Sequence, residues 1–140
     1  MTAPLSSVFN LHEFEVIASK ALPDKVYAYY ACSADDEVSY RQNHHSWSRI
    51  FFRPRVLVDV SEIDLRTKML GQEFPVPFYV SATAMCGLGN PEGAECSITR
   101  ACGQPQWRVP QMVSTFSSNT LEEIAASRTD KAQQLWFQLY

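Results

Sequence analysis

The sequence lacks the features that mark several large classes of protein. Its 12 basic and 15 acidic residues are interspersed and give a net charge of −3, so neither nucleic acid nor an anionic membrane is an expected partner. No apolar stretch approaches the roughly 20 residues that span a bilayer. The first residues carry no basic segment followed by an apolar run, so no secretory signal is expected. These absences predict a soluble intracellular protein, with the mitochondrial and cytoplasmic compartments both left open.

Motifs for metals and nucleotides are also missing. The four cysteines, Cys32, Cys86, Cys96 and Cys102, match no zinc spacing and form no C-x-x-C pair, so they are predicted to be reduced thiols in or near a core. The three histidines have no ligand partner at motif spacing, and no metal is expected. No predicted strand is followed by G-x-G-x-x-G or by a P-loop, and the glycine-rich stretch 87–91 is interpreted as a turn.

What the sequence does contain is a helical first half behind a flexible N-terminus at residues 1–9. Asn10 and Glu13 form a capping-box-like start, and apolar residues at helical spacing predict a helix over residues 11–22. Pro23 ends that helix and opens a second one. A third helix is predicted over residues 36–50.

The hydrophobic period changes after residue 50. Prolines among β-branched residues favour extended chain over residues 51–60, and residues 64–74 predict a short hairpin with its turn near Gly71. From residue 75 strands alternate with helices, which predicts βαβ units and a parallel sheet. The pattern alone leaves a (β/α)8 barrel and an open sheet both possible.

The expected elements of this second half are three strands and two helices. Short apolar runs predict the strands at residues 77–82, 111–114 and 135–140. Asn90 and Pro91 are typical of a helix start, and that helix is predicted to extend to Cys102. Thr120 and Glu123 form a capping box for a second helix that ends near Ser127.

The last of these strands is the most informative segment. Residues 134–140 are mainly apolar, yet they carry polar side chains at Gln138 and Tyr140. A buried amide without a partner costs free energy, so such side chains are expected to meet a ligand. We expect the chain to be the first part of a larger catalytic domain, because domains usually end in polar tails.

Four segments of the sequence resemble one family. The chain is similar to the FMN-dependent 2-hydroxy-acid dehydrogenases and oxidases, and most similar among them to the flavin domain of fungal cytochrome-linked L-lactate dehydrogenases. The likeness extends from about Asn10 to Tyr140. It rests on Tyr27-Ala-Tyr-Tyr30 with Ala34-Asp-Asp-Glu37, on residues 48–60, on Val76-Pro-Phe-Tyr-Val-Ser-Ala-Thr-Ala84, and on Val109-Pro-Gln-Met-Val-Ser-Thr115 with Gln138-Leu-Tyr140.

The resemblance implies an α/β fold, namely the N-terminal portion of a (β/α)8 barrel with about three βα units. Residues 10–140 would be part of the flavin domain, with a helical and hairpin region at 10–74 and the first barrel strands and helices at 75–140. Active residues of such barrels lie at the carboxyl ends of the strands. The expected strand ends place Ala82, Ser114 and Gln138 at such positions.

The resemblance also assigns roles to individual residues. Backbone amides of Ala82, Thr83 and Ala84 would approach the flavin ring of FMN, and Ser114 and Gln138 would hydrogen-bond the ring. The side chains implied to surround the substrate are Tyr29, which would bind its carboxylate, Phe116, which would form the wall around its side chain, and Tyr140, whose hydroxyl would face the reacting group. From the residues alone, Tyr29 is interpreted as a core aromatic and Ser114 as a cap or turn residue.

The implied activity is oxidation of an L-2-hydroxy acid, lactate-like, to a 2-keto acid. The family's histidine base, carboxylate-binding arginine and flavin-side lysine come from later strands, so this chain alone is expected to be inactive and to bind FMN weakly. The electron acceptor, a cytochrome or oxygen, stays open, and the full-length family member is expected to form a homo-oligomer. The alternative is a non-catalytic truncated paralogue that serves as an interaction module.

Overall fold

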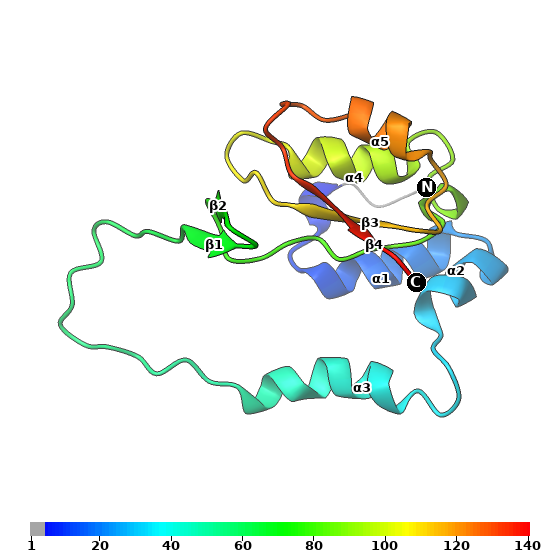
Figure 1. The fold of residues 1–140 in the computed structure, drawn as a ribbon. Coiled ribbons are helices and arrows are strands. Elements are labelled where there is room, and N and C mark those ends of the chain that lie inside the picture. The colour runs from blue at the N-terminus through cyan, green and yellow to red at the C-terminus, as the bar shows by residue number, and fades with distance from the viewer. Residues whose placement is uncertain (1–4) are drawn as a thin grey trace. The chain divides into compact units, whose positions relative to one another are not determined.

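The computed structural model describes residues 5–140, which divide into two compact units at Asp59 and Val60 (Figure 1). The flexible N-terminus predicted for residues 1–9 lies partly outside the described residues, and Leu5–Ser7 forms a 3-10 helix. Among residues 5–140, no helix is both long and apolar enough to cross a membrane. The helices of the first unit are α1 (Leu11–Ala21), α2 (Asp24–Ala31), α3 (Val38–His45) and a 3-10 helix at Ser46–Arg49.

The start of α1 follows from its capping residues. The side chain of Asn10 accepts hydrogen bonds from the backbone N–H groups of His12 and Glu13, at 3.0 and 3.2 Å. The Glu13 carboxylate in turn accepts from the N–H of Phe9 at 2.8 Å. The predicted helix start is therefore confirmed. None of the residues of α1, α2 or α3 is fully buried.

The third helix is shorter than the sequence predicts. It begins at Val38 because Glu37 adopts a left-handed backbone conformation with φ of 55°, which a right-handed helix does not accept. The Glu37 carboxylate accepts a hydrogen bond from the N–H of Ser33 at 3.0 Å and so holds the turn before the helix. After His45 the helix tightens into the 3-10 helix at Ser46–Arg49. The predicted range of 36–50 is therefore wrong at its N-terminal end.

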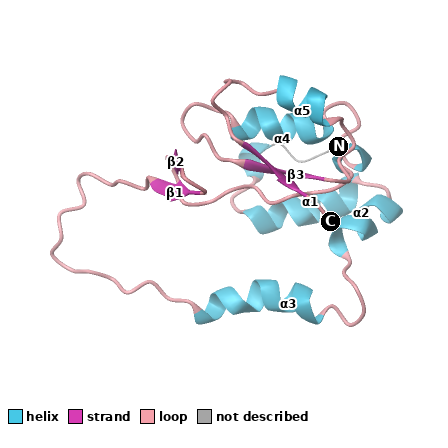
Figure 2. Cartoon of the chain, viewed as in Figure 1, coloured by secondary structure: helices cyan, strands magenta, loops and turns pink. Residues whose placement is uncertain are grey.

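The second unit combines a hairpin with a parallel ladder (Figure 2). Strands β1 and β2 pair antiparallel around the turn at Gly71, as predicted. Strands β3 and β4 pair parallel, with Gln111 opposite Leu135 and Ser114 opposite Gln138. The bounds are β1 (Thr67–Met69), β2 (Gln72–Phe74), a 3-10 helix (Cys86–Leu88), α4 (Ala94–Cys102), β3 (Gln111–Ser114), α5 (Leu121–Ala126) and β4 (Leu135–Gln138).

The strand predicted at residues 77–82 is reduced to a single parallel bridge. Val80 donates its N–H to the carbonyl of Pro110 at 2.9 Å, and its carbonyl accepts from Met112 at 2.8 Å. Pro75 and Pro77 have no N–H to donate, which limits pairing before the bridge. The segment nevertheless lies beside β3 and pairs parallel to it, as β4 does, so the predicted parallel sheet is confirmed.

The first helix of the second unit also begins later than predicted. α4 starts at Ala94, whose positive φ of 41° breaks the helical path from the turn at Asn90. Asn90 still acts at this end, because its carbonyl accepts from Ala94 at 2.8 Å and its side-chain oxygen accepts from Gly93 at 3.3 Å. The predicted N-cap at Asn90 is therefore wrong: the N-cap position belongs to Gly93, and Asn90 holds the turn that precedes the helix.

Helices α4 and α5 cover one face of the β3–β4 ladder (Figure 1). Thr99 of α4 donates its hydroxyl to the side-chain oxygen of Gln111 at 2.6 Å, so Gln111 and Val113 face the helices. The predicted capping box opens α5: Thr120 Oγ1 accepts from the N–H of Glu123, and the Glu123 carboxylate accepts from the N–H of Thr120. The buried apolar side chains of this unit include Val76, Val109, Val113, Ile124 and Cys102.

The opposite face of the ladder carries an aromatic cluster. The ring of Trp136 in β4 lies 5.2 Å from that of Tyr79 and 6.0 Å from that of Phe74, measured between centroids. Phe74 ends β2 and is buried. These contacts fasten the hairpin to the ladder face that is free of helices.

Candidate active site

The carboxyl ends of β3 and β4 bring together two of the predicted flavin contacts. Ser114 and Gln138 are direct partners in the parallel register, so their side chains project from the same face of the ladder. Side chains alternate along a strand, and Gln111 and Val113 of β3 face α4. Ser114 therefore lies on the opposite face of the ladder, away from α4. Ser114 is buried and Gln138 is half-buried. The sequence-based placement of these two residues at one strand edge is thus matched by the register.

The two residues that follow these strand ends meet as an aromatic pair. Phe116 and Tyr140 stack with ring centroids 5.6 Å apart and an interplanar angle of 28°. Their side chains are largely exposed, at 62% and 77%. The Tyr140 hydroxyl donates to Gln138 Oε1 at 2.9 Å, and the Thr115 hydroxyl donates to the carbonyl of Gln138. The strand ends therefore present one continuous surface of aromatic and amide groups.

The segment after Val80 adds backbone donors to the same edge. Met85 donates its N–H to the carbonyl of Phe116 at 3.0 Å, which ties this segment to the exit of β3. Within residues 5–140, the N–H groups of Ala82, Thr83 and Ala84 have no hydrogen-bond acceptor. Small side chains here leave the backbone accessible. Donors of this kind, together with Ser114 and Gln138, are what the acceptor-rich edge of a flavin ring would require, and their contact with FMN stays a prediction.

Tyr29 belongs to α2 in the first unit, whereas the strand-end residues belong to the second. Its ring is 47% exposed and packs edge-on against Tyr30 at 5.2 Å. It is not the buried core aromatic that the sequence also allowed. Its role toward a substrate carboxylate stays a prediction.

Sequence reasoning missed one residue of this edge, Glu95 in the first turn of α4. Its carboxylate is buried and accepts three backbone N–H groups: from Ser118 at 2.9 Å, from Cys86 at 3.0 Å and from Asn119 at 3.2 Å. Burial acts to raise the pKa of Glu95, but these hydrogen bonds together outweigh burial and hold the pKa below its ordinary value. The signal that could have identified Glu95 from the sequence is the position of an acidic residue on the apolar face of a predicted helix.

Two of the thiols have raised pKa values, that of Cys86 in the loop after Ala84 and that of Cys102 at the end of α4. Burial, reinforced by the neighbouring Glu95 carboxylate, raises the pKa of Cys86 to about 11. Burial also raises the pKa of Cys102. All four cysteines are free; Cys102 is buried as predicted, but Cys32 is exposed, so its placement in or near a core was wrong. In the described part of the chain, no cluster of His, Cys, Asp or Glu is arranged to hold a metal ion.

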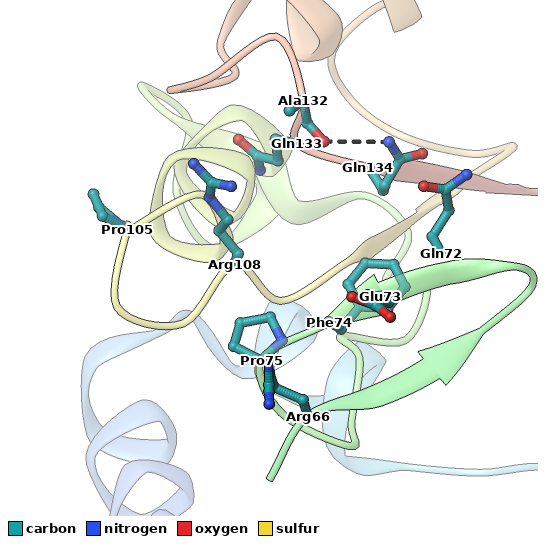
Figure 3. Close-up of a pocket in the computed structure, with 10 residues that line it drawn as sticks. All are labelled: Arg66, Gln72, Glu73, Phe74, Pro75, Pro105, Arg108, Ala132, Gln133 and Gln134. Carbon is teal, nitrogen blue, oxygen red and sulfur yellow. Dashed lines mark hydrogen bonds between the residues drawn. The ribbon is translucent and has the colours of Figure 1, made fainter. Parts of the chain in front are cut away.

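A cavity lies at the opposite edge of the ladder and does not belong to this site. It has a volume of about 520 Å³ and is bounded by the segments that precede β3 and β4 and by the hairpin (Figure 3). Arg66 and Arg108 contribute its charge, but each guanidinium is paired, with Asp64 and Asp130 respectively, at 2.8 Å. Because barrel enzymes act at the carboxyl ends of their strands, we place the candidate active site at the other edge.

Comparison with known proteins identifies the family of the chain. The model of the family described as FMN-dependent dehydrogenase matches residues 18–140. Over 137 residues the chain is 49% identical to L-lactate dehydrogenase (cytochrome) of Saccharomyces cerevisiae, a match that covers 98% of this chain and 23% of the yeast protein. It is 37% identical to glycolate oxidase of Spinacia oleracea over 120 residues, covering 86% of this chain and 32% of the spinach protein.

Solved structures show the same relationship. The flavin-binding domain of baker's yeast flavocytochrome b2 superposes with a TM-score of 0.94 at 48% identity, covering 99% of this chain and 35% of that one. A soluble mutant of the (S)-mandelate dehydrogenase from Pseudomonas putida superposes with a TM-score of 0.83 at 31% identity, covering 96% and 37%. The chain thus spans about a quarter to a third of the curated relatives' length. It belongs to the FMN-dependent dehydrogenase family.

Proposed function

We propose that the protein oxidises an L-2-hydroxy acid, of lactate type, to the 2-keto acid, and that this chain supplies the first part of its (β/α)8 barrel and of its FMN site. The observation that carries the proposal is the strand edge: Ser114 and Gln138 face the same way in register, beside three backbone N–H groups without acceptors. The 49% identity to L-lactate dehydrogenase (cytochrome) supports the substrate type. FMN, when bound, accepts the electrons that leave the substrate.

Each residue of the edge has a defined task in this proposal. The N–H groups of Ala82, Thr83 and Ala84 and the hydroxyl of Ser114 hold the flavin ring. Because Gln138 Oε1 already accepts from Tyr140, its amide N–H₂ is the group directed to a ring carbonyl. Phe116 forms the wall beside the substrate side chain.

Tyr140 and Tyr29 are the two substrate-facing tyrosines of the proposal. The Tyr140 hydroxyl donates its hydrogen bond to Gln138 Oε1. The lone pairs of its oxygen are therefore left to accept a hydrogen bond from the substrate hydroxyl. Tyr29 would bind the substrate carboxylate. The proton acceptor, the carboxylate-binding arginine and the lysine beside the flavin are assigned to later barrel strands. Homo-oligomerisation, and a cytochrome or oxygen as electron acceptor, belong to the full-length protein.

The proposal predicts that Tyr140→Phe in the full-length protein lowers kcat about 10- to 100-fold, because one hydrogen bond to the reacting group is lost. The measurement is anaerobic bleaching of the flavin absorbance by L-lactate. Glycolate and L-mandelate are tested in the same way as alternative substrates, which checks the assignment of the substrate type. Tyr79→Phe is the matched control, since its ring packs on Trp136 away from the strand exits. Unchanged kcat in Tyr140→Phe, or no bleaching by any hydroxy acid in the unmodified protein, would refute the proposal.

The 140 residues expressed alone are expected to show no lactate-dependent dye reduction and only weak FMN binding. The reason is that the assigned base, arginine and lysine lie outside them, and that the ladder has an unpaired edge. A dye-reduction assay with added FMN tests this, and turnover by the purified chain contradicts it. A stable, monodisperse chain without flavin affinity would instead favour the alternative of a non-catalytic interaction module.

A further inference from the structure

Glu95 joins two loops that flank the candidate site. One loop follows Ala84 and includes Cys86; the other follows Phe116 and includes Ser118 and Asn119. The Glu95 carboxylate accepts one N–H from the first loop and two from the second, at 2.9 to 3.2 Å. The two loops are 30 residues or so apart in sequence, and this carboxylate is their common acceptor.

The three N–H groups depend on Glu95 alone. Within residues 5–140, the backbone N–H groups of Cys86, Ser118 and Asn119 have no other acceptor. A buried carboxylate is costly unless its charge is hydrogen-bonded, so an apolar side chain would be less costly to bury at this position. The carboxylate is therefore explained by the two loops that it holds and not by packing of the helix.

Two further hydrogen bonds place this junction next to the site. Met85 donates its N–H to the carbonyl of Phe116 at 3.0 Å, and Gly87 donates its N–H to Ser118 Oγ at 2.9 Å. Each loop-to-loop contact lies within a few residues of the free N–H groups of Ala82–Ala84 or of the Phe116 ring. A displacement of either loop would move both the backbone donors and the aromatic wall.

We propose that Glu95 is a positioning residue of the FMN site: by fastening the loop after Ala84 to the loop after β3, it sets the position of the N–H groups of Ala82–Ala84 and of Phe116. Glu95 itself touches neither cofactor nor substrate in this proposal, which rests on the proposed function for the identity of the ligand. The fastening of the loops does not depend on that identity.

The test replaces the carboxylate by an amide of nearly equal shape in the full-length protein. In Glu95→Gln, the amide can be oriented in two ways. Either Oε1 keeps the N–H groups of Cys86 and Ser118 and the new N–H₂ group faces the N–H of Asn119, or the amide flips and its N–H₂ group faces the N–H groups of Cys86 and Ser118. We expect the Kd for FMN to rise about tenfold or more and the visible spectrum of the bound flavin to shift. Glu92→Gln is the matched control, because Glu92 is exposed in the turn before α4.

A second readout is independent of flavin and of turnover. The Glu95 carboxylate contributes, after burial, to the raised pKa of Cys86. Glu95→Gln is therefore expected to shift the pH–rate profile for alkylation of Cys86 to lower pH, because the variant removes the neighbouring charge and releases the loop that buries the thiol. The alkylated residue is identified by peptide mass spectrometry, and Glu92→Gln should leave the profile unchanged.

The outcomes separate the two proposals. If the unmodified protein binds no FMN, the proposed function fails, and an alkylation profile of Glu95→Gln that matches that of the unmodified protein then overturns the role of Glu95 in holding the loops. If the unmodified protein binds FMN and Glu95→Gln matches it in Kd and spectrum, the positioning role is overturned. Should Glu95→Gln not fold, Glu95→Asp keeps the charge on a side chain too short to hold all three donors of the two loops; a Kd for FMN raised about twofold to fivefold supports the role, and an unchanged Kd overturns it.

Discussion

Ile124→Ala is expected to lower the free energy of unfolding by about 2–5 kcal/mol, the usual range when a large buried aliphatic side chain is truncated. Ile124 is fully buried, with 0% of its surface exposed, and it is the one buried residue of α5. The six-residue helix is too short to be stable without packing. Losing this contact therefore loosens α5 as a whole, and with it the loop that carries Ser118 and Asn119.

The measurement is urea unfolding at 25 °C, followed by circular dichroism and tryptophan fluorescence, with midpoints and slopes compared. Leu121→Ala is the matched control, because Leu121 lies in the same helix but is 48% exposed, and it should cost less than about 1 kcal/mol. Equal losses for the two variants would show that the helix is not held by its buried residue.

Gly103→Ala is expected to cost about 2–5 kcal/mol, although the backbone of Gly103 is one that alanine readily adopts. Its φ is −81°, so the cost comes from space. A Cβ at this position would overlap Gln133 Oε1 and Thr129 Oγ1 and lie 2.7 Å from Gln133 Cδ. Buried Gln133 would have to move, and it would give up its 2.7 Å hydrogen bond to the carbonyl of Thr99.

A double-mutant cycle separates this explanation from a general loss of helix stability. In a Gln133→Ala background the overlap with the amide disappears, so the added cost of Gly103→Ala should fall by more than half. Urea unfolding of the four proteins gives the coupling energy. If the two costs simply add, the clash with Gln133 is not the cause. The same network includes a hydrogen bond from the Thr129 hydroxyl to the carbonyl of Gly103 at 2.6 Å.

Local signals were sufficient for much of the fold. The caps at Asn10 and Thr120 act through residues two or three positions away, so the sequence alone identifies them. The hairpin around Gly71 and the strands β3 and β4 were also predicted, because alternation of side chains and turn residues are local properties. From the strand ends, the common edge of Ser114 and Gln138 follows by the geometry of parallel strands.

What the sequence did not reveal depends on distant partners. An acid in the first turn of a helix is ordinarily explained by the helix dipole, and nothing near Glu95 in sequence indicates that donors from Ser118 and Asn119 converge on it. Alanine rarely adopts a positive φ, so the residue type did not indicate the positive φ of Ala94 that makes α4 begin later than predicted.

The order of the parallel ladder has a consequence for how the second unit forms during synthesis. Each segment pairs with the next one along the chain: Val80 with β3, and β3 with β4. Contacts of this kind close one βαβ unit at a time and avoid the entropic cost of joining distant ends. The ribosome releases these segments in the same order in which they pair. Sheet growth can therefore follow translation strand by strand, with each new strand finding its neighbour already in place.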